Sequence, residues 1–166
     1  MKFSIDSTDL AILAIVQDDA SLSNQALAER VGVSPATCLR RVQRLRDAGV
    51  LEKEVAIVNP WALAKATGRP PAITCIVEVS LDRQDSAAQQ AFETAALQHP
   101  QVQQCWRVAA GPDFVLIINC LDMPAWHAFS QALFTRENNV RNIKAYFATH
   151  RARWNSSIPL PHLKRP

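Results

Sequence analysis

The residues best suited to chemistry are four arginines between Pro35 and Asp47, with no acidic residue among them: Arg40, Arg41, Arg44 and Arg46. Guanidinium groups bind phosphate oxygens and the major-groove edge of guanine. The positive charge is local, because residues 1–58 hold 7 Lys/Arg and 8 Asp/Glu, a net charge of −1, whereas the whole chain has +3. Such a patch predicts contact with nucleic acid more strongly than the total charge does.

Two short helices joined by a tight turn are predicted to position these arginines. The apolar residues of the first helix, which spans residues 24–31, lie on one side: Leu27, Ala28 and Val31. Gly32 follows, where a helix end favours a residue that tolerates positive φ. Ser34 then stands at an N-cap position and Pro35 at the first position of a second helix, which is a strong start signal.

The second helix is predicted to have an apolar stripe made of Cys38, Leu39, Val42 and Leu45. Two helices of this kind form a helix-turn-helix, whose second helix enters the major groove of double-stranded DNA. We expect its first turn to meet a phosphate through backbone N–H groups. The predicted DNA contacts are Asn24, Ser34, Pro35, Thr37, Arg40, Arg41 and Arg44. The alternative is an ordinary helical hairpin with a solvated basic face.

Composition excludes several other classes of protein. The four cysteines, Cys38, Cys75, Cys105 and Cys120, form no C-x-x-C pair, and no histidine lies at zinc-ligand spacing from them. They predict free thiols in a reducing cytoplasm and no metal site. The longest apolar runs are too short to span a bilayer, and no signal peptide is evident. No catalytic constellation or cofactor motif stands out, so we predict neither catalytic residues nor a cofactor.

The N-terminal half is predicted to be a DNA-binding domain over residues 1–58. Asp6 or Ser7 can cap a first helix that carries Leu10, Ile12, Leu13 and Val16. Residues 50–58 alternate imperfectly and predict a short strand or hairpin, as in a winged helix-turn-helix. Asn59-Pro60 ends that segment, and residues 59–71 are predicted to be a linker with one possible helical turn.

The C-terminal half predicts a βαββαβ domain over residues 72–160, followed by a tail over 161–166. Strands are expected over residues 72–81, 102–109, 114–121 and 140–154, with helices over 85–99 and 124–136. This order is ferredoxin-like, with two helices on one face of an antiparallel sheet, and makes the whole chain α+β. The open face of the sheet needs a cover, and Ile76, Val115, Ile117 and Phe147 are candidates for a sheet-to-sheet dimer. Alternatively, these four side chains serve only the core of the monomer.

Several motifs resemble those of the Lrp/AsnC family of transcriptional regulators. Residues 5–13 (IDSTDLAIL) resemble the opening LDxxDxxIL, and residues 27–51 resemble the long helix-turn-helix motif LAxRVGLSPxxCLRRVxRLxxxGVI. Residues 102–105 and 111–114 resemble the ligand-loop motif VxxCxxVxGxxDY, and residues 156–160 resemble the usual ending. The resemblance implies homodimers that assemble further, often into octamers, and an amino acid as effector.

The resemblance also implies an effector site made by Gly111, Pro112, Asp113, Ile143 and Ala145. Ile143 and Ala145 stand where the family often has small hydroxyl residues. They therefore predict an apolar ligand end, a ligand held by backbone groups, or a pocket that has lost its ligand. Asp113 either accepts the α-amino group of an amino acid or caps the turn. Sirohaem decarboxylases share this architecture, but the matching stretch CWRVAAGPDF has no histidine. We therefore predict a regulator that is not an enzyme.

Overall fold

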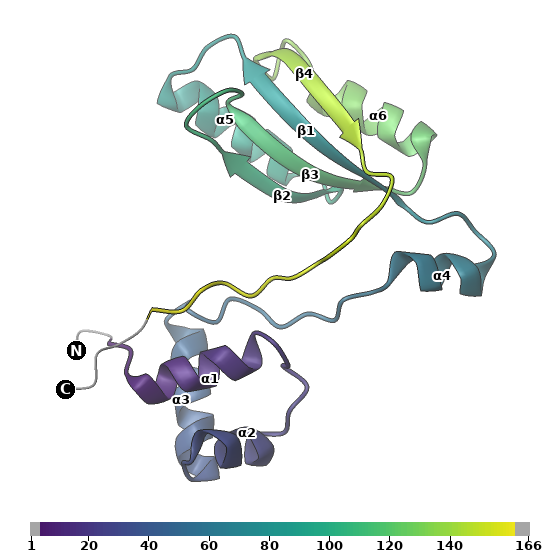
Figure 1. Cartoon of the computed structure of the whole chain (residues 1–166). Coiled ribbons are helices and arrows are strands. Elements are labelled where there is room, and N and C mark those ends of the chain that lie inside the picture. The colour runs from purple at the N-terminus through teal and green to yellow at the C-terminus, as the bar shows by residue number, and fades with distance from the viewer. Residues whose placement is uncertain (1–3, 162–166) are drawn as a thin grey trace. The chain divides into compact units, whose positions relative to one another are not determined.

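The computed structural model describes residues 4–161, which divide into two compact units (Figure 1). The first unit contains the chain up to Ile57 together with the segment that begins at Arg153. The second unit is Val58–Ala152. The sequence had placed residues 153–160 with the C-terminal domain, whereas the contacts of this segment lie in the N-terminal unit.

The first unit is a bundle of three helices, α1 (Ser7–Val16), α2 (Asn24–Val31) and α3 (Pro35–Asp47). The expected helix signals are confirmed: Ser34 caps α3, Pro35 begins it, and Gly32 ends α2 with a φ of 75°. Asp6 and Asp9 form a capping box at the start of α1, in which each side chain accepts the other residue's backbone N–H. The buried core of this unit comprises Ile12, Leu13, Leu27, Ala28, Cys38, Val42 and Leu45.

The strand predicted over residues 50–58 is not formed. Residues 52–59 have no regular secondary structure, and Val55, Ile57 and Val58 are exposed. A strand needs a partner to satisfy its backbone groups, and no strand of the described residues pairs with this segment. The prediction for the linker is closer to the structure. Where one helical turn was expected, the linker contains the helix α4 (Pro60–Thr67), which has about two turns.

The second unit confirms the βαββαβ order. Its elements after α4 are β1 (Ile73–Leu81), α5 (Ser86–Leu97), β2 (Val102–Arg107), β3 (Phe114–Cys120), α6 (Met123–Leu133) and β4 (Val140–Phe147). The strands form an antiparallel sheet in the order β2-β3-β1-β4, and α5 and α6 cover one face (Figure 1). The largest fully buried side chains between helices and sheet are Phe92, Phe114, Leu81, Leu116, Ile118 and Leu133, and the buried Trp126 and Phe129 of α6 pack with them.

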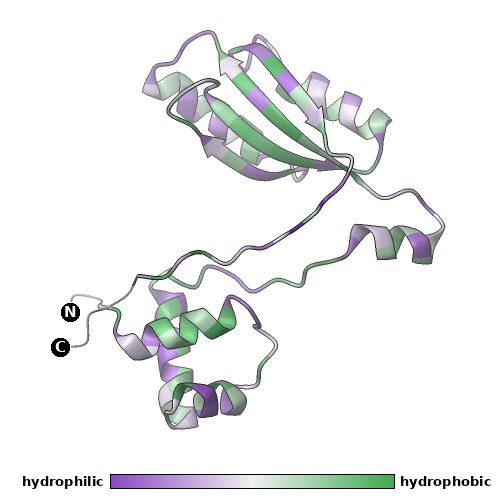
Figure 2. Cartoon of the chain, in the orientation of Figure 1, coloured by the Kyte–Doolittle hydropathy of each residue, from purple (hydrophilic) through white to green (hydrophobic). Residues whose placement is uncertain are grey.

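Alternation along the strands separates a core face from an open face. Val77 and Val79 of β1 are fully buried, whereas Ile76 between its buried neighbours is 40% exposed. Figure 2 shows this alternation along β1 and nearly continuous hydrophobic residues along β3. Ile76, Val115 and Ile117 therefore lie on the open face, as expected for a sheet-to-sheet interface.

The prediction that Phe147 belongs to the open face is wrong, because this residue lies on the face that the helices cover. It pairs with the buried Cys75, and its ring packs edge-on against Trp126 of α6 at 5.3 Å between centroids. The predicted length of the last strand is also wrong. β4 ends at Phe147. Directly after it, Ala148 N donates a backbone hydrogen bond to Thr74 O of β1.

Candidate nucleic-acid interface and ligand pocket

Helix α3 presents a mixed face to solvent. Its buried residues are Cys38, Val42 and Leu45, spaced at helical intervals. Leu39 was predicted to join them, but it is 57% exposed, because it lies about 100° further round the helix than Cys38. Arg40 and Gln43 are also exposed. Arg40 forms no ion pair within residues 4–161, so its guanidinium is available to an external anion.

The N-terminal end of α3 is fixed by short polar contacts. The Ser34 hydroxyl accepts a hydrogen bond from Thr37 N at 3.3 Å and donates one to Thr37 Oγ1 at 2.9 Å. Asn24 Nδ2 of α2 donates to Pro35 O at 2.9 Å, which ties the two helices together across the turn. The structure thus brings Asn24, Ser34, Pro35 and Thr37 to one corner, where the N-terminus of α3 favours an anion.

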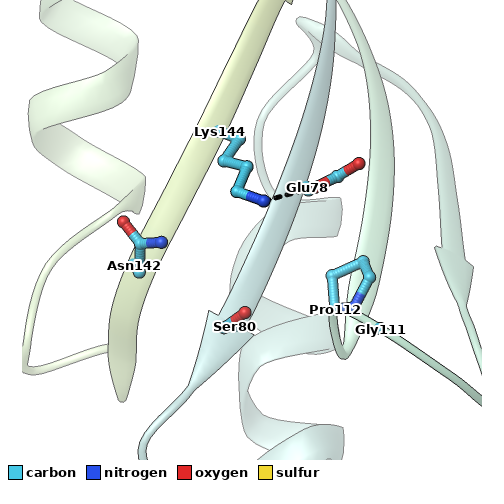
Figure 3. Close-up of a pocket in the computed structure, with 6 residues that line it drawn as sticks. All are labelled: Glu78, Ser80, Gly111, Pro112, Asn142 and Lys144. Carbon is cyan, nitrogen blue, oxygen red and sulfur yellow. Dashed lines mark ion pairs between the residues drawn. The ribbon is translucent and has the colours of Figure 1, made fainter.

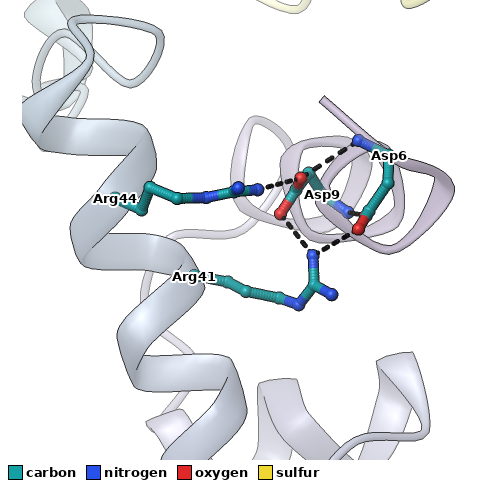
Figure 4. A network of polar contacts seen from close by, with 4 residues as sticks. All are labelled: Asp6, Asp9, Arg41 and Arg44. Carbon is teal, nitrogen blue, oxygen red and sulfur yellow. Dashed lines mark hydrogen bonds and ion pairs between the residues drawn. The ribbon is translucent and has the colours of Figure 1, made fainter. Parts of the chain in front are cut away.

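Arg41 and Arg44 point toward α1 and not toward the solvent side of α3 (Figure 4). Arg41 Nη1 donates to Asp6 Oδ2 at 2.7 Å and to Asp9 Oδ1 at 2.9 Å. Arg44 Nη2 pairs with Oδ2 of Asp9, and the side chain of Asp9 is fully buried. Arg41 and Arg44, which the sequence predicts as DNA contacts together with Arg40, therefore do not lie beside Arg40 on the solvent-facing side of α3. They flank the stripe, and α1 lies along that flank.

This network shifts the pKa values of Asp6 and Arg41. Backbone N–H donation from Asp9, followed by the Arg41 guanidinium, lowers the pKa of Asp6 below its ordinary value, and burial opposes the shift only in part. Hydrogen bonds from Arg41 to Asp6 and Asp9 raise the pKa of Arg41. Asp6 and Arg41 are therefore both charged at neutral pH.

A polar depression of about 430 Å³ lies on the open face of the sheet in the second unit (Figure 3). It is lined by Glu78 and Ser80 of β1, Asn142 and Lys144 of β4, and Gly111 and Pro112 of the turn before β3. Lys144 Nζ and Glu78 Oε2 lie 3.8 Å apart. An ammonium and a carboxylate side by side can each bind the opposite group of a zwitterion.

The five residues predicted for the effector site do not share this depression. Gly111 and Pro112 line it. Asp113 is only 7% exposed, and its Oδ2 accepts hydrogen bonds from Leu81 N at 2.7 Å and Gln84 Nε2 at 3.2 Å. The structure thus favours the turn-fixing role of Asp113 over contact with a ligand.

Ile143 and Ala145 lie on the face of the sheet that the helices cover. They pair with Val79 and Val77 of β1 and pack against the core. The prediction of one pocket containing all five residues is therefore wrong for this protomer, because adjacent positions of a strand point to opposite faces.

Both halves of the chain match known family models. Residues 5–52 match a winged helix-turn-helix DNA-binding domain, and residues 74–156 match the Lrp/AsnC ligand-binding domain. The chain belongs to the Lrp/AsnC family of transcriptional regulators. It is therefore a DNA-binding regulator with a ligand-binding domain, and the match gives no support to the sirohaem decarboxylase alternative.

Individual Lrp/AsnC proteins match over nearly the whole chain. An HTH-type transcriptional regulator of Haemophilus influenzae is 38% identical over 95% of this chain and 90% of its own length. The leucine-responsive regulatory protein of Escherichia coli is 30% identical over 86% of this chain and 83% of its own. A transcriptional regulator of Neisseria meningitidis in complex with L-methionine superposes with a TM-score of 0.76, at 27% identity, covering 94% of this chain and 97% of that chain.

Sequence reasoning missed four of the six lining residues of the depression, namely Glu78, Ser80, Asn142 and Lys144. The alternation of polar and apolar residues in β4 carried a usable signal, since Asn142 and Lys144 interleave with Ile143 and Ala145. Asp9 was missed as the partner of two arginines, although it stands in the motif that resembles the opening of Lrp/AsnC proteins.

The described residues contain no helix long and apolar enough to cross a membrane. The cysteines are free thiols, three buried and Cys105 half-buried.

Proposed function

We propose that this Lrp/AsnC regulator binds specific double-stranded DNA sites in the cytoplasm as a homo-oligomer and responds to an amino acid. The proposal of DNA binding rests on the solvent-facing side of α3. There, Arg40 and Gln43 stand beside the apolar Leu39, next to the helix N-terminus at Ser34. Arginine, glutamine and an aliphatic side chain match guanine, adenine and the thymine methyl group in the major groove.

Asn24, Ser34, Pro35 and Thr37 serve this interface at the N-terminal turn, and Arg40 supplies the cation. Arg40→Ala is expected to weaken binding to the specific site by roughly 1–3 kcal/mol. Arg83→Ala, which removes one exposed charge from the other unit, is the matched control. Footprinting with fluorescence titration measures both effects, and half-sites are expected about one helical turn apart or at a multiple of that spacing. Equal, unchanged binding by Arg40→Ala and the control would contradict this interface.

The open sheet face supports the homodimer. Ile76 (40% exposed), Trp106 (59%) and Tyr146 (50%) lie on it beside the half-buried Val115 and Ile117. Contiguous exposed apolar side chains mark interfaces. Ile76→Lys is expected to convert the assembly to monomers in sedimentation velocity, whereas Leu63→Lys on α4 leaves it intact. Wild-type protein that sediments as a monomer would disprove the proposal.

An amino acid fits the polar depression, with its carboxylate on Lys144 and its ammonium group on Glu78. The methionine complex of the Neisseria relative supports this class of ligand. A ligand that binds only the folded state raises the melting temperature. We expect at least one amino acid to do so with the wild type, and not with Lys144→Gln or Glu78→Gln. Lys65→Gln is the control for loss of one lysine. Normal stabilisation of both pocket variants would place the ligand elsewhere.

A further inference from the structure

The buried carboxylate of Asp9 is surrounded by donors from two directions (Figure 4). Oδ1 accepts from Arg41 Nη1 at 2.9 Å, and Oδ2 accepts from Arg44 and, at 3.1 Å, from Asp6 N. The two arginines stand 32 and 35 residues away in the sequence. A single acid on α1 thus engages two of the cations on the DNA-reading helix.

We propose that Asp9 is a positioning residue for DNA recognition, which withdraws Arg41 and Arg44 from the DNA and leaves Arg40 as the arginine of α3 that has no ion-pair partner among residues 4–161. This inference rests on the proposed DNA face of α3. It implies that the basic character of α3 in the sequence overstates the number of phosphates that the helix neutralises.

Burial makes the hold of Asp9 strong. The side chain of Asp9 is 0% exposed, whereas that of Arg41 is 23% exposed and that of Arg44 is 43% exposed. An arginine that left for a phosphate would leave a buried carboxylate short of a partner, which is unfavourable. The contrast on the same helix is Arg46, whose partner Glu54 is 40% exposed and can be hydrated when the pair opens.

Salt dependence of DNA binding reports how many cations meet phosphates. Each neutralised phosphate of B-DNA adds about 0.9 to the slope of log Kobs against log salt concentration. In the wild type, Arg40 contributes to this slope and Arg41 and Arg44 do not. Asp9→Asn keeps the size of the side chain and removes its charge, so both arginines are held less tightly. Arg44 loses its ion pair with Asp9, and Arg41 keeps its ion pair with the exposed Asp6, which a phosphate can replace.

The experiment measures the affinity of the full chain for a specific and an unrelated duplex between about 50 and 200 mM KCl. Asp9→Asn is expected to steepen the slope by about one to two and to raise affinity for the unrelated duplex at low salt. The ratio of specific to unrelated affinity falls. In the variant Asp9→Asn/Arg41→Gln/Arg44→Gln the slope returns to that of the wild type. A folded Asp9→Asn protein with weaker binding and an unchanged slope would assign Asp9 a merely structural role and overturn the proposal.

Two single variants test the same point in the presence of Asp9. Arg41→Gln and Arg44→Gln are expected to leave the slope unchanged, whereas Arg40→Gln lowers it by about one. A lower slope in Arg41→Gln or Arg44→Gln would show phosphate contact by these arginines and overturn the proposal, whether or not Asp9→Asn folds. Arg40→Gln tests the proposed DNA face of α3 alone. The experiment can therefore contradict the DNA face without contradicting the role of Asp9, and the reverse.

Discussion

The carboxylate of Asp113 accepts a hydrogen bond from the backbone N–H of Leu81 at 2.7 Å, where β1 ends beside the turn that leads into β3. The backbone of Asp113 also joins the two segments, since its N–H donates to Val79 O at 2.8 Å and its carbonyl accepts from Val108 N at 3.1 Å. Asp113 therefore holds the turn that contains Gly111 and Pro112 against β1. Its contribution to a ligand site is indirect, through the position of that turn.

Asp113→Ala is expected to lower the free energy of unfolding by about 1–3 kcal/mol, because it leaves the N–H of Leu81 buried without an acceptor. Urea unfolding of the ligand-free chain, followed by circular dichroism, measures the loss. Asp113→Asn retains an acceptor oxygen and is expected to lose less. If ligand-free Asp113→Ala is as stable as the wild type, Asp113 does not hold the turn and is again a candidate for contact with the ligand.

Local signals in the sequence were sufficient for the order of elements. The Gly32, Ser34 and Pro35 signals act within one turn of chain, so the boundary between α2 and α3 was predictable. The run of β-branched residues in β1 and the apolar run in β3 likewise predicted strands, because each strand is buried on the face toward the helices and carries further apolar residues on its open face.

Features that depend on a distant partner were not predictable in the same way. Arg41 and Arg44 flank the buried stripe of α3, and only the placement of α1 decides that this flank meets Asp9. The end of β4 follows from its pairing with β1, which stops at the pair of Cys75 and Phe147, and residues 148–154 carry no local signal for that end. The contacts of the segment that begins at Arg153 were not predictable for a similar reason, since they lie more than a hundred residues upstream.

Acid is expected to weaken the capping box at the start of α1. Asp6 has a pKa below its ordinary value of 3.8, chiefly because Asp9 N donates to its carboxylate and Arg41 pairs with it. Its stabilisation is therefore fully present above that ordinary value, and it is lost as the pH falls toward the lower folded-state pKa. Asp6→Ser keeps a good N-cap and cannot titrate. The difference in unfolding free energy between wild type and Asp6→Ser should shrink in acid, and a difference that stays constant from neutral pH to about pH 3 would contradict this assignment.

Thiol reactivity is expected to divide the cysteines into two groups. Burial raises the pKa of Cys75 to about 11, and burial also raises the pKa values of Cys38, Cys105 and Cys120. At about pH 8 the Cys75 thiol is therefore about one-thousandth thiolate and reacts slowly. Cys38, Cys75 and Cys120 are at most 3% exposed, which also keeps a reagent from them. Titration of the native protein with dithionitrobenzoate should therefore show no more than one reactive thiol, that of the half-buried Cys105, and four after unfolding. Cys105→Ser removes the native signal, and rapid reaction of two or more native thiols would be inconsistent with this structure.

The C-terminal segment forms part of the DNA-binding unit. Ile158 exchanges two hydrogen bonds with the Gln17 side chain after α1, at 3.1 and 3.2 Å. Ser157 Oγ donates to Asp18 Oδ1 at 2.7 Å, and Leu160 packs against the helical core. Residues 148–152 connect β4, which carries Lys144, to this segment of the DNA-binding unit.

A chain that ends at Trp154 should therefore have a less stable helix-turn-helix. The three lost hydrogen bonds contribute about 0.5–1.5 kcal/mol each, and the partly buried Leu160 adds about 1 kcal/mol, so a loss of about 2.5–5.5 kcal/mol is expected. Hydrogen exchange of the α1 and α3 amides resolves this unit from the sheet, whose protection should not change. A chain that ends at Pro161 keeps every contact described for the segment and is the matched control. Equal protection of α1 in the two truncated chains would show that the segment only rests on the helices, whereas faster exchange confined to the shorter chain would make it a structural part of the DNA-binding unit.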